Sequence, residues 1–459
     1  MHRLLAAREC GEDVHGLDDI SSERWTKLQP DPSRSFQSSI INHVSAIDLD
    51  TPAGQLLLCA GQTTFGGSLT VHAYPQRDCK PADEPLESST RNPASDGIRC
   101  VKWFPNDAAI FVTGNTRQWN ARQWAEVHVW DSDCFKSVCN FRLEHAGVRA
   151  IDLSSAPGAR PELIATAPEL AREIRLLDMS SGASTHCLQA HQAVVNDVRW
   201  APLHPHVLGS CDDDGVVCLF DVRRSGRSAC LLKFDHSRRI GTYESNVAGG
   251  GENVAVNGRL SSSHRSKRAR VSKNADAQIG RVATLGLGCA WTPQWGGRCA
   301  RRARASTLRT TKDDFKPALN VRFSTDGTQI VSTTTGTSFR VWDVTTGRLI
   351  SEFHDPSLYG RRRGRQFTHM ASDGIHSVWA VRGCLQVIDV QDGMMVHSVE
   401  LDKGGFDAML LHPLEEEVVC AHGSEICVWS YENSAREGRG DGDSEAEVDI
   451  ANVLPRVRL

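Results

Sequence analysis

The stretch VCLFD, Val217 to Asp221, decides the fold, because it belongs to a series of short apolar runs that end in aspartate. Its relatives are VHVWD at 127–131, IRLLD at 174–178, FRVWD at 339–343 and LQVID at 385–389, with weaker copies finishing at Tyr74 and Tyr431. Where the series is uninterrupted, successive aspartates are 47, 43 and 46 residues apart. A four-stranded propeller blade takes about 40–45 residues. The seven runs therefore predict an all-β fold, a closed seven-bladed β-propeller.

Each unit also has the same internal order. An alternating strand such as VNDVRW (195–200) is followed by a turn, a short strand, a second turn and the run that ends in aspartate. This is the WD-repeat pattern, in which a histidine, a turn aspartate, a serine or threonine and a tryptophan form a buried hydrogen-bonded tetrad. We assign His191, Ser210 and Asp213 to this tetrad. Phe220 stands in the tryptophan position without an indole N–H, so we expect this blade to rely more on packing.

Composition places the chain among ordinary globular proteins. It has 459 residues, 40% hydrophobic and 24% charged, with a formal net charge of −4. The 15 cysteines include no C-x-x-C pair, which favours buried free thiols in a reducing compartment. The apolar run within the first ten residues is too short to form the core of a signal peptide. No run in the chain approaches the ~18 apolar residues of a membrane span. We expect a soluble intracellular protein with no membrane partner.

Changes in composition predict the domain boundaries. We expect a helical N-terminal arm over 1–35, with a second helix around Trp25, and propeller blades 1–4 over 36–236. A basic low-complexity insertion rich in Gly, Ser and Asn follows over 237–316. Blades 5–7 then occupy 317–432, and a disordered charged tail occupies 433–459.

The insertion contains two basic runs. HRSKRARV (264–271) fits a nuclear-import signal made by Arg265, Lys267, Arg268 and Arg270, and predicts residence in the nucleus, although a solvated loop has the same composition. A second run at 298–309 follows Trp291 and Trp295, a combination that suits stacking on single-stranded nucleic acid. A structureless insertion is the simpler interpretation, so direct nucleic-acid contact stays open.

Enzyme motifs are missing from the sequence. There is no G-x-S-x-G, no P-loop, no H-E-x-x-H and no paired Cys/His spacing. The run CDDDGV (211–216) gathers carboxylates, but aspartate and glycine are favoured in a hairpin turn for backbone reasons. We therefore predict no catalytic residue, no metal site and no cofactor.

Two segments, Ile98 to Asp131 and His186 to Ser237, resemble the Cockayne syndrome A protein family. The opening MHRLLAARECGEDVH is similar to that family's N-terminal helix, and Leu5, Ala7, Arg8 and Gly11 stand at matching positions. The likeness covers most of residues 1–236 and 317–345 and fades over the last two blades.

The resemblance implies the non-catalytic substrate receptor of a cullin-4 RING E3 ubiquitin ligase that acts in transcription-coupled nucleotide-excision repair. It implies attachment through the damaged-DNA-binding adaptor protein, and through that adaptor to cullin-4 and the RING subunit. Repair factors at stalled RNA polymerase II, such as the Cockayne syndrome B protein, are further implied partners. In the family a blade end written W-D-x-R faces the adaptor. Here it reads Phe220, Asp221, Val222, Arg223, with Arg224 added.

The residues themselves support such a contact. We expect Asp221 to orient Arg223, whose planar guanidinium suits bidentate contact with a partner carboxylate or carbonyl. Arg3, Leu4, Leu5 and Arg8 lie at helical spacing and predict a short helix ordered in a partner groove. Two alternatives remain: a frayed N-terminus, and a generic WD-repeat scaffold of a chromatin or RNA-processing complex in which DVRR is a plain turn.

Overall fold

The computed structural model describes most of residues 24–431. The residues outside the description are 1–23, 52, 64–65, 77–83, 90–96, 116–124, 157, 159–162, 237–239, 244–316, 335–337, 355–368, 373–375, 382–383, 391–393, 401–405 and 432–459. The chain divides into one unit of residues 1–255 with 315–459, and a second of residues 256–314. The second unit falls wholly outside the description.

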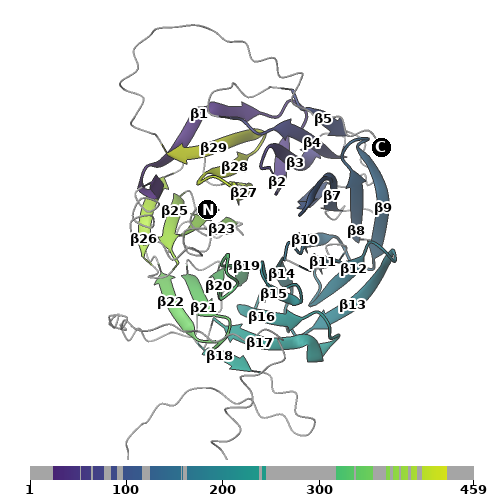
Figure 1. Ribbon diagram of the computed structural model, residues 1–459, viewed down its shortest axis with the longest axis vertical. Coiled ribbons are helices and arrows are strands. Elements are labelled where there is room, and N and C mark those ends of the chain that lie inside the picture. The colour runs from purple at the N-terminus through teal and green to yellow at the C-terminus, as the bar shows by residue number, and fades with distance from the viewer. Residues whose placement is uncertain are drawn as a thin grey trace, which may run out of the picture. The chain divides into compact units, whose positions relative to one another are not determined.

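The first unit is a ring of seven antiparallel β-sheets (Figure 1). Blade 1 consists of β2 (His43–Leu49), β3 (Leu56–Thr63), β4 (Gly66–Ala73) and β5 (Glu87–Ser89). Blade 2 consists of β6 (Ile98–Phe104), β7 (Asp107–Asn115), β8 (Ala125–Asp131) and β9 (Lys136–Leu143). Blade 3 consists of β10 (Val148–Leu153), β11 (Leu163–Pro168), β12 (Glu173–Asp178) and β13 (Ala183–Gln189).

The remaining blades follow the same order. Blade 4 consists of β14 (Val195–Trp200), β15 (Val207–Asp212), β16 (Val216–Asp221), β17 (Cys230–Asp235) and β18 (Ile240–Tyr243), with a 3₁₀ turn η1 at Arg227–Ala229. Blade 5 consists of β19 (Ala318–Phe323), β20 (Gln329–Thr334), β21 (Ser338–Asp343) and β22 (Leu349–His354). Blade 6 consists of β23 (His369–Ser372), β24 (His376–Val381), β25 (Cys384–Asp389) and β26 (Met395–Glu400). Blade 7 consists of β27 (Ala408–Leu411), β28 (Val418–His422), β29 (Glu425–Tyr431) and β1 (Leu28–Gln37).

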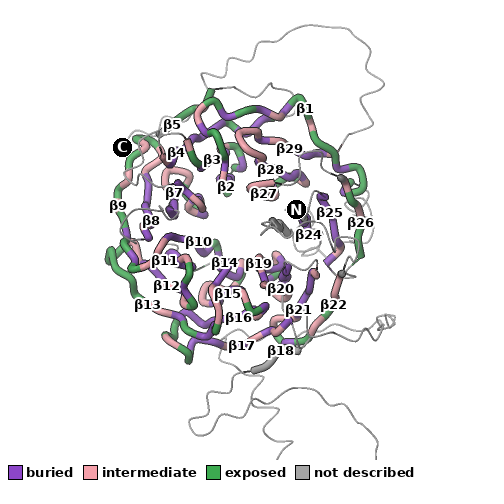
Figure 2. Tube along the Cα trace, turned by 180° about the vertical axis from the view of Figure 1, so that it is seen from behind, coloured by how far each residue is buried: buried purple, intermediate pink, exposed green. Residues whose placement is uncertain are grey.

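The predicted seven-bladed propeller is confirmed. The runs that end in aspartate or tyrosine are the third strands of their blades, β4, β8, β12, β16, β21, β25 and β29. Their apolar residues are buried because they pack on neighbouring blades, and Figure 2 shows exposed residues gathered mainly on the outermost strands. The repeated apolar run therefore identifies the buried third strand of each blade.

The predicted arm over 1–35 is wrong at its C-terminal end. Residues 24–26 form a single helical turn, and β1 pairs with β29 as the outer strand of blade 7, with Leu28 opposite Tyr431. Pro30 and Pro32 conceal this strand in the sequence, since proline is tolerated in strands only at edges and bulges. The register of β1 shifts between Asp31 and Phe36, which is such an irregularity. The N-terminal strand therefore closes the ring.

The predicted start of the insertion at 237 is also too early. Residues 240–243 form β18, which pairs with β17 as a fifth strand of blade 4, with Leu232 opposite Tyr243. A four-residue strand carries too few positions for its alternation to stand out in the sequence. The rest of the insertion lies outside the described residues.

A buried ion pair joins β1 to the rest of the ring. The Arg34 guanidinium donates to both carboxylate oxygens of Glu417 at 2.7 and 2.8 Å, and to the Pro75 carbonyl at 2.8 Å. The Tyr74 hydroxyl donates to the same carboxylate at 2.7 Å. Since the Arg34 and Glu417 side chains are 1% and 0% exposed, each charge depends on the other for compensation. The network links blades 1 and 7, where the two ends of the propeller meet.

The blade 4 tetrad is built as predicted except for its acid. The His191 ring lies between Ser210 Oγ, 2.6 Å from Nε2, and Asp212 Oδ2, 2.7 Å from Nδ1. Asp213, which the sequence pattern assigned to the tetrad, instead accepts from Asn196 Nδ2 at 2.8 Å. Asp212 is the last residue of β15, whereas Asp213 is the first residue of the turn that follows, so a shift of one position moves the acid off the tetrad. Asp212 is the correct member.

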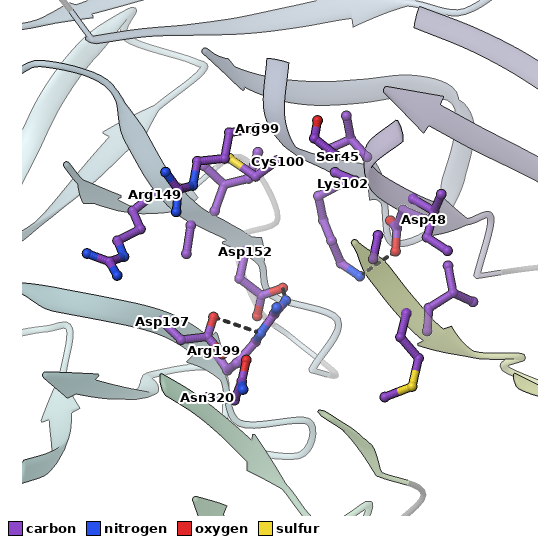
Figure 3. A pocket seen from close by; sticks show the side chains of 18 of the residues that line it. Ser45, Asp48, Arg99, Cys100, Lys102, Arg149, Asp152, Asp197, Arg199 and Asn320 are labelled. Atoms are coloured by element: carbon purple, nitrogen blue, oxygen red, sulfur yellow. Dashed lines mark hydrogen bonds and ion pairs between the residues drawn. The ribbon is translucent and has the colours of Figure 1, made fainter. Parts of the chain in front are cut away.

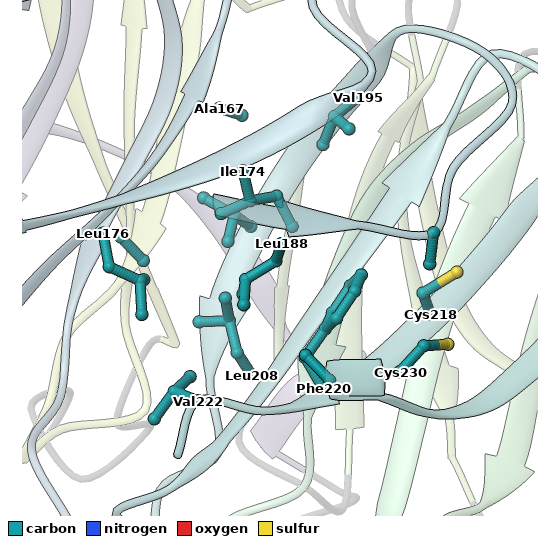
Figure 4. Packing of buried hydrophobic residues seen from close by; sticks show 14 of the residues in the cluster. Ala167, Ile174, Leu176, Leu188, Val195, Leu208, Cys218, Phe220, Val222 and Cys230 are labelled. Atoms are coloured by element: carbon teal, nitrogen blue, oxygen red, sulfur yellow. The ribbon is translucent and has the colours of Figure 1, made fainter. Parts of the chain in front are cut away.

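Phe220 fills the tryptophan position by packing alone. Its ring is fully buried, with its centroid 6.0 Å from that of His191. Figure 4 shows it in an apolar cluster between blades 3 and 4, near Leu208, Val222 and Cys230. Packing thus takes over from the missing indole hydrogen bond, as expected.

Blade 5 has a second set that sequence reasoning missed. His236 Nε2 lies 2.7 Å from Ser332 Oγ, to which the Trp342 indole N–H donates at 3.2 Å. The insertion separates His236 from Ser332 and Trp342 in the sequence, so the three residues do not stand out as one set. The spacing could have revealed the set, because Ser332 and Trp342 are ten residues apart, as are Ser210 and Phe220.

Burial of His72 makes ring closure sensitive to acid. This side chain is 2% exposed, its ring packs on Phe36 of β1, and desolvation lowers its pKa to about 4. An unfolded histidine titrates near pKa 6.5, so below that pH the unfolded state takes up a proton that the folded state does not. The resulting stability is present at neutral pH and is lost as the pH falls from about 6.5 toward about 4.

We expect that lowering the pH from about 7.5 to about 5.5 reduces the free energy of unfolding by about 1 kcal/mol through His72. Urea unfolding of the parent and of His72→Gln at both pH values measures the contribution as the difference in pH dependence. Equal pH dependence of the two proteins would exclude His72 as a source of acid sensitivity.

Candidate functional site

The antiparallel order of the strands gives the ring two distinct ends. The turns after the first and third strands of a blade lie at one end, where Val222 N–H donates to the His206 carbonyl at 2.9 Å. We call this end the Arg223 face. The turns after the second and fourth strands lie at the other end, which we call the Leu170 face.

Asp221 and Arg223 form a closed fork on the Arg223 face. The Arg223 side chain donates to Asp221 through Nε at 2.9 Å and Nη2 at 2.8 Å, and its backbone N–H donates at 3.0 Å. Partial burial alone would raise the pKa of Asp221, but these hydrogen bonds outweigh it and hold that pKa below its usual range. The Arg223 side chain is 49% exposed. The predicted orientation of Arg223 by Asp221 is therefore present.

Asp221 leaves part of the Arg223 guanidinium for the predicted contact. It occupies the edge formed by Nε and Nη2, so a partner meets the two N–H groups of Nη1 and the second N–H of Nη2, which together form the other bidentate edge. The neighbouring Arg224 is exposed, with its backbone N–H donating to the Asp221 carbonyl at 3.1 Å. Arg223 is thus presented in a fixed position and Arg224 beside it.

The loop that carries both arginines, residues 222–229, is attached to blade 3. Gly226 N–H donates to the Cys187 carbonyl at 2.8 Å, and Gln189 N–H donates to the Gly226 carbonyl at 3.2 Å. Gly226 has φ 65° and ψ −146°, a conformation that is largely restricted to glycine. Gly226 is therefore needed to turn the loop back onto β13 and hold it there.

The chain enters the propeller at the same face. The Arg24 guanidinium donates to Glu416 at 3.2 Å and lies 5.0 Å from the centroid of the Tyr431 ring. Trp25 is 2% exposed in an apolar cluster with Leu28. The segment before residue 24 therefore starts from the Arg223 face. Arg3, Leu4, Leu5 and Arg8 lie outside the described residues, as do Arg265, Lys267, Arg268 and Arg270.

Large apolar side chains are exposed on this face. They stand in its turns and at the starts of its outer strands: Leu203, Ile350, Met394, Met395 and Leu414. Methionine and arginine are enriched in protein interfaces, whereas isolated exposed apolar residues are common on any surface. Their shared location with Arg223 makes this face the candidate docking surface. Sequence reasoning missed these residues, because no repeat pattern marks exposed turn positions.

A channel of about 750 Å³ lies between the innermost strands. Ion pairs bridge neighbouring blades along its wall: Lys102 Nζ donates to Asp48 at 2.9 Å, and Arg322 donates to Asp197 at 2.5 Å. Arg199 lies between Asp197 and Asp152, at 3.4 and 3.5 Å (Figure 3). The second oxygens of Asp48 and Asp152 each accept a backbone N–H of the next blade, so these aspartates join inner strands.

Over the part of the chain that the structure describes, no group of three or more His, Cys, Asp or Glu side chains is arranged to hold a metal ion. In the same residues, no helix has the length and apolar character to cross a membrane.

Residues 182–221 match the model of the WD domain, G-beta repeat family. Over 344 residues the chain is 24% identical to the WD repeat-containing protein ATCSA-1 of Arabidopsis thaliana, with 72% of each chain covered. It superposes on the crystal structure of Chaetomium thermophilum Raptor with a TM-score of 0.58 and 12% identity, over 90% of this chain. That match spans 30% of the Raptor chain and shows the fold alone. The chain is a seven-bladed β-propeller with a WD40 repeat that covers the last strand of blade 3 and the first three strands of blade 4, and propellers of this kind are generally non-catalytic scaffolds that mediate protein–protein interactions.

Proposed function

We propose that the chain is the substrate receptor of a cullin-4 RING ubiquitin ligase and docks on the damaged-DNA-binding adaptor through the Arg223 face. In this role it contributes no catalytic residue. It carries targets to the ligase in transcription-coupled nucleotide-excision repair, together with factors such as the Cockayne syndrome B protein. The proposed site of action is the nucleus, which rests on the basic run at 264–271 alone.

The observation that carries the proposal is the Asp221–Arg223 fork on a loop fixed to the neighbouring blade. A guanidinium held in advance loses little conformational freedom on binding, which favours affinity. The same face of the ring also carries exposed methionines and leucines and the entry point of the N-terminal segment, although most of these belong to other blades. The name of the Arabidopsis relative and the sequence resemblance support the same assignment.

The alternative is a generic WD-repeat scaffold of a chromatin or RNA-processing complex. It predicts that the basic insertion over 237–316 makes the contacts and that the 222–229 loop is a plain turn. The two functions differ in which complex co-purifies with the chain and in whether Arg223 matters.

We expect Arg223→Glu to weaken binding to the purified adaptor by about 2–4 kcal/mol, because reversing the charge leaves partner groups unpaired or repelled. Arg224→Ala is the comparison variant at a neighbour that Asp221 does not hold through its side chain, and it should cost less. Titration by calorimetry gives both affinities, and thermal melting checks that both variants keep the fold. Equal affinity of parent and Arg223→Glu would favour the scaffold function.

A further inference from the structure

The loop over 222–229 concentrates positive charge around one serine. It holds no acidic residue, and three exposed arginines stand two positions before Ser225, one position before it and two positions after it: Arg223, Arg224 and Arg227. The Ser225 side chain is exposed as well. Since protein kinases select substrates by the charges around the accepting hydroxyl, this serine suits a kinase that recognises basic residues on both sides.

The Asp221–Arg223 fork changes what holds the hydroxyl of this turn. In the turns after the third strands of blades 3 and 5, a hydroxyl donates to the aspartate that ends the strand: Ser181 to Asp178 at 2.9 Å and Thr345 to Asp343 at 2.6 Å. In blade 4 the Arg223 guanidinium occupies both carboxylate oxygens of Asp221. Ser225 Oγ donates instead to the Cys187 carbonyl at 3.4 Å, which is long for such a bond. The fork therefore leaves the Ser225 hydroxyl weakly held.

Ser228, the other serine of the loop, is held more firmly. Its hydroxyl donates to the Ser225 carbonyl at 2.8 Å, and it lies inside the 3₁₀ turn η1. Ser225 precedes this turn and belongs to no helix or strand. Within this loop, an exposed position, basic neighbours on both sides and a weak hydroxyl contact therefore coincide at Ser225.

From these features we propose that Ser225 is the phosphorylation site of a protein kinase that recognises basic residues. The Ser225 oxygen forms a bond to the γ-phosphorus of ATP, and the bond from that phosphorus to the oxygen of the departing ADP breaks. The hydroxyl proton passes to a base of the kinase. The site itself does not depend on the adaptor, because it follows from the loop alone.

The phosphate releases the chain from the adaptor, a consequence that rests on the proposed function. A phosphoserine carries about −1.5 to −2 charges at pH 7, which cancels the excess of the three arginines over Asp221. Its oxygens bind guanidiniums in a forked geometry, so they compete with the partner for the N–H groups of Arg223 and Arg224. Gly226 N–H keeps its bond to the Cys187 carbonyl at 2.8 Å, so the loop stays attached to blade 3.

The full-length chain is incubated with ATP, Mg²⁺ and the purified catalytic domain of protein kinase C, and mass spectrometry maps the phosphate. We expect phosphate on Ser225 and about tenfold less on Ser228. Arg227→Glu should slow phosphorylation of Ser225 about tenfold, because it reverses a charge that the kinase recognises. Arg142→Glu on the outer strand β9 is the matched control, since it makes the same charge change on an exposed side chain away from the loop, and should alter the rate less than about twofold.

Calorimetry with the purified adaptor then tests the release. The phosphorylated parent should bind about tenfold more weakly than the untreated parent, because the loop has lost its positive charge. Ser225→Ala after the same kinase treatment should bind as it did before treatment, which separates Ser225 from every other phosphorylated position. Thermal melting checks that the phosphorylated parent keeps its fold.

No phosphate on Ser225, or equal rates for the parent and Arg227→Glu, would overturn the site. Unchanged adaptor affinity of the phosphorylated parent would overturn the release. If the untreated parent does not bind the adaptor, the proposed function fails and the release fails with it, whereas the phosphate map still decides the site.

Discussion

Glu417→Gln is expected to destabilise the folded propeller by about 3–5 kcal/mol, because it leaves the buried Arg34 guanidinium without a counter-charge. Both side chains are almost fully buried, and the Tyr74 hydroxyl donates to the same carboxylate. The loss of stability should exceed that of an ordinary polar substitution, because the pair holds β1 in blade 7, where the two ends of the propeller meet. Chemical unfolding followed by tryptophan fluorescence measures it.

Glu416→Gln is the matched control. This neighbour pairs with Arg24 at 3.2 Å, but the Arg24 side chain is 44% exposed, and such surface pairs contribute about 0–1 kcal/mol. A double replacement of Arg34 and Glu417 by methionine should recover part of the loss, since an apolar pair needs no charge compensation. Equal unfolding free energies for Glu417→Gln and Glu416→Gln would show that the buried pair does not secure closure.

Deletion of residues 1–15 is expected to abolish most adaptor binding. If the predicted helix inserts in a partner groove, each buried leucine contributes about 1.5–3 kcal/mol. The anchoring of Arg24 and Trp25 places the origin of this segment at the Arg223 face, so one partner can reach both contacts.

Deletion of residues 445–459 removes the same number of residues from the other terminus and should leave the affinity within about twofold. Affinity for the purified adaptor is measured for both truncations, with thermal melting to check the ring. Parent-like binding after loss of residues 1–15 would mean that the adaptor contacts the propeller alone.

The repeat predicted the fold because each blade reuses one strand pattern, and that pattern depends on nearby residues only. The repeat did not predict β1, because an outer strand with prolines lacks the apolar alternation of an inner one. It also did not predict the Arg34–Glu417 pair, because its two residues are 383 positions apart in the sequence. The sequence pattern points to Asp213 in place of Asp212 because three adjacent aspartates do not show where β15 ends and the turn begins, and the strand in fact ends at Asp212.

The candidate site was predicted in part. The relation of Asp221 to Arg223 follows from local geometry and was foreseen. The attachment of their loop to β13 and the gathering of exposed apolar residues on the Arg223 face depend on how blades lie against one another. No spacing within a single repeat encodes these features.

The most direct measurement of the central claim is hydrogen exchange of the full chain with and without the purified damaged-DNA-binding adaptor. Adaptor docking predicts slower exchange in the 222–229 loop, in the first 15 residues and in the turn that contains Glu416, with no change in the turn that contains Leu170. No complex, or protection confined to residues 237–316 or to the Leu170 face, would contradict docking through the Arg223 face.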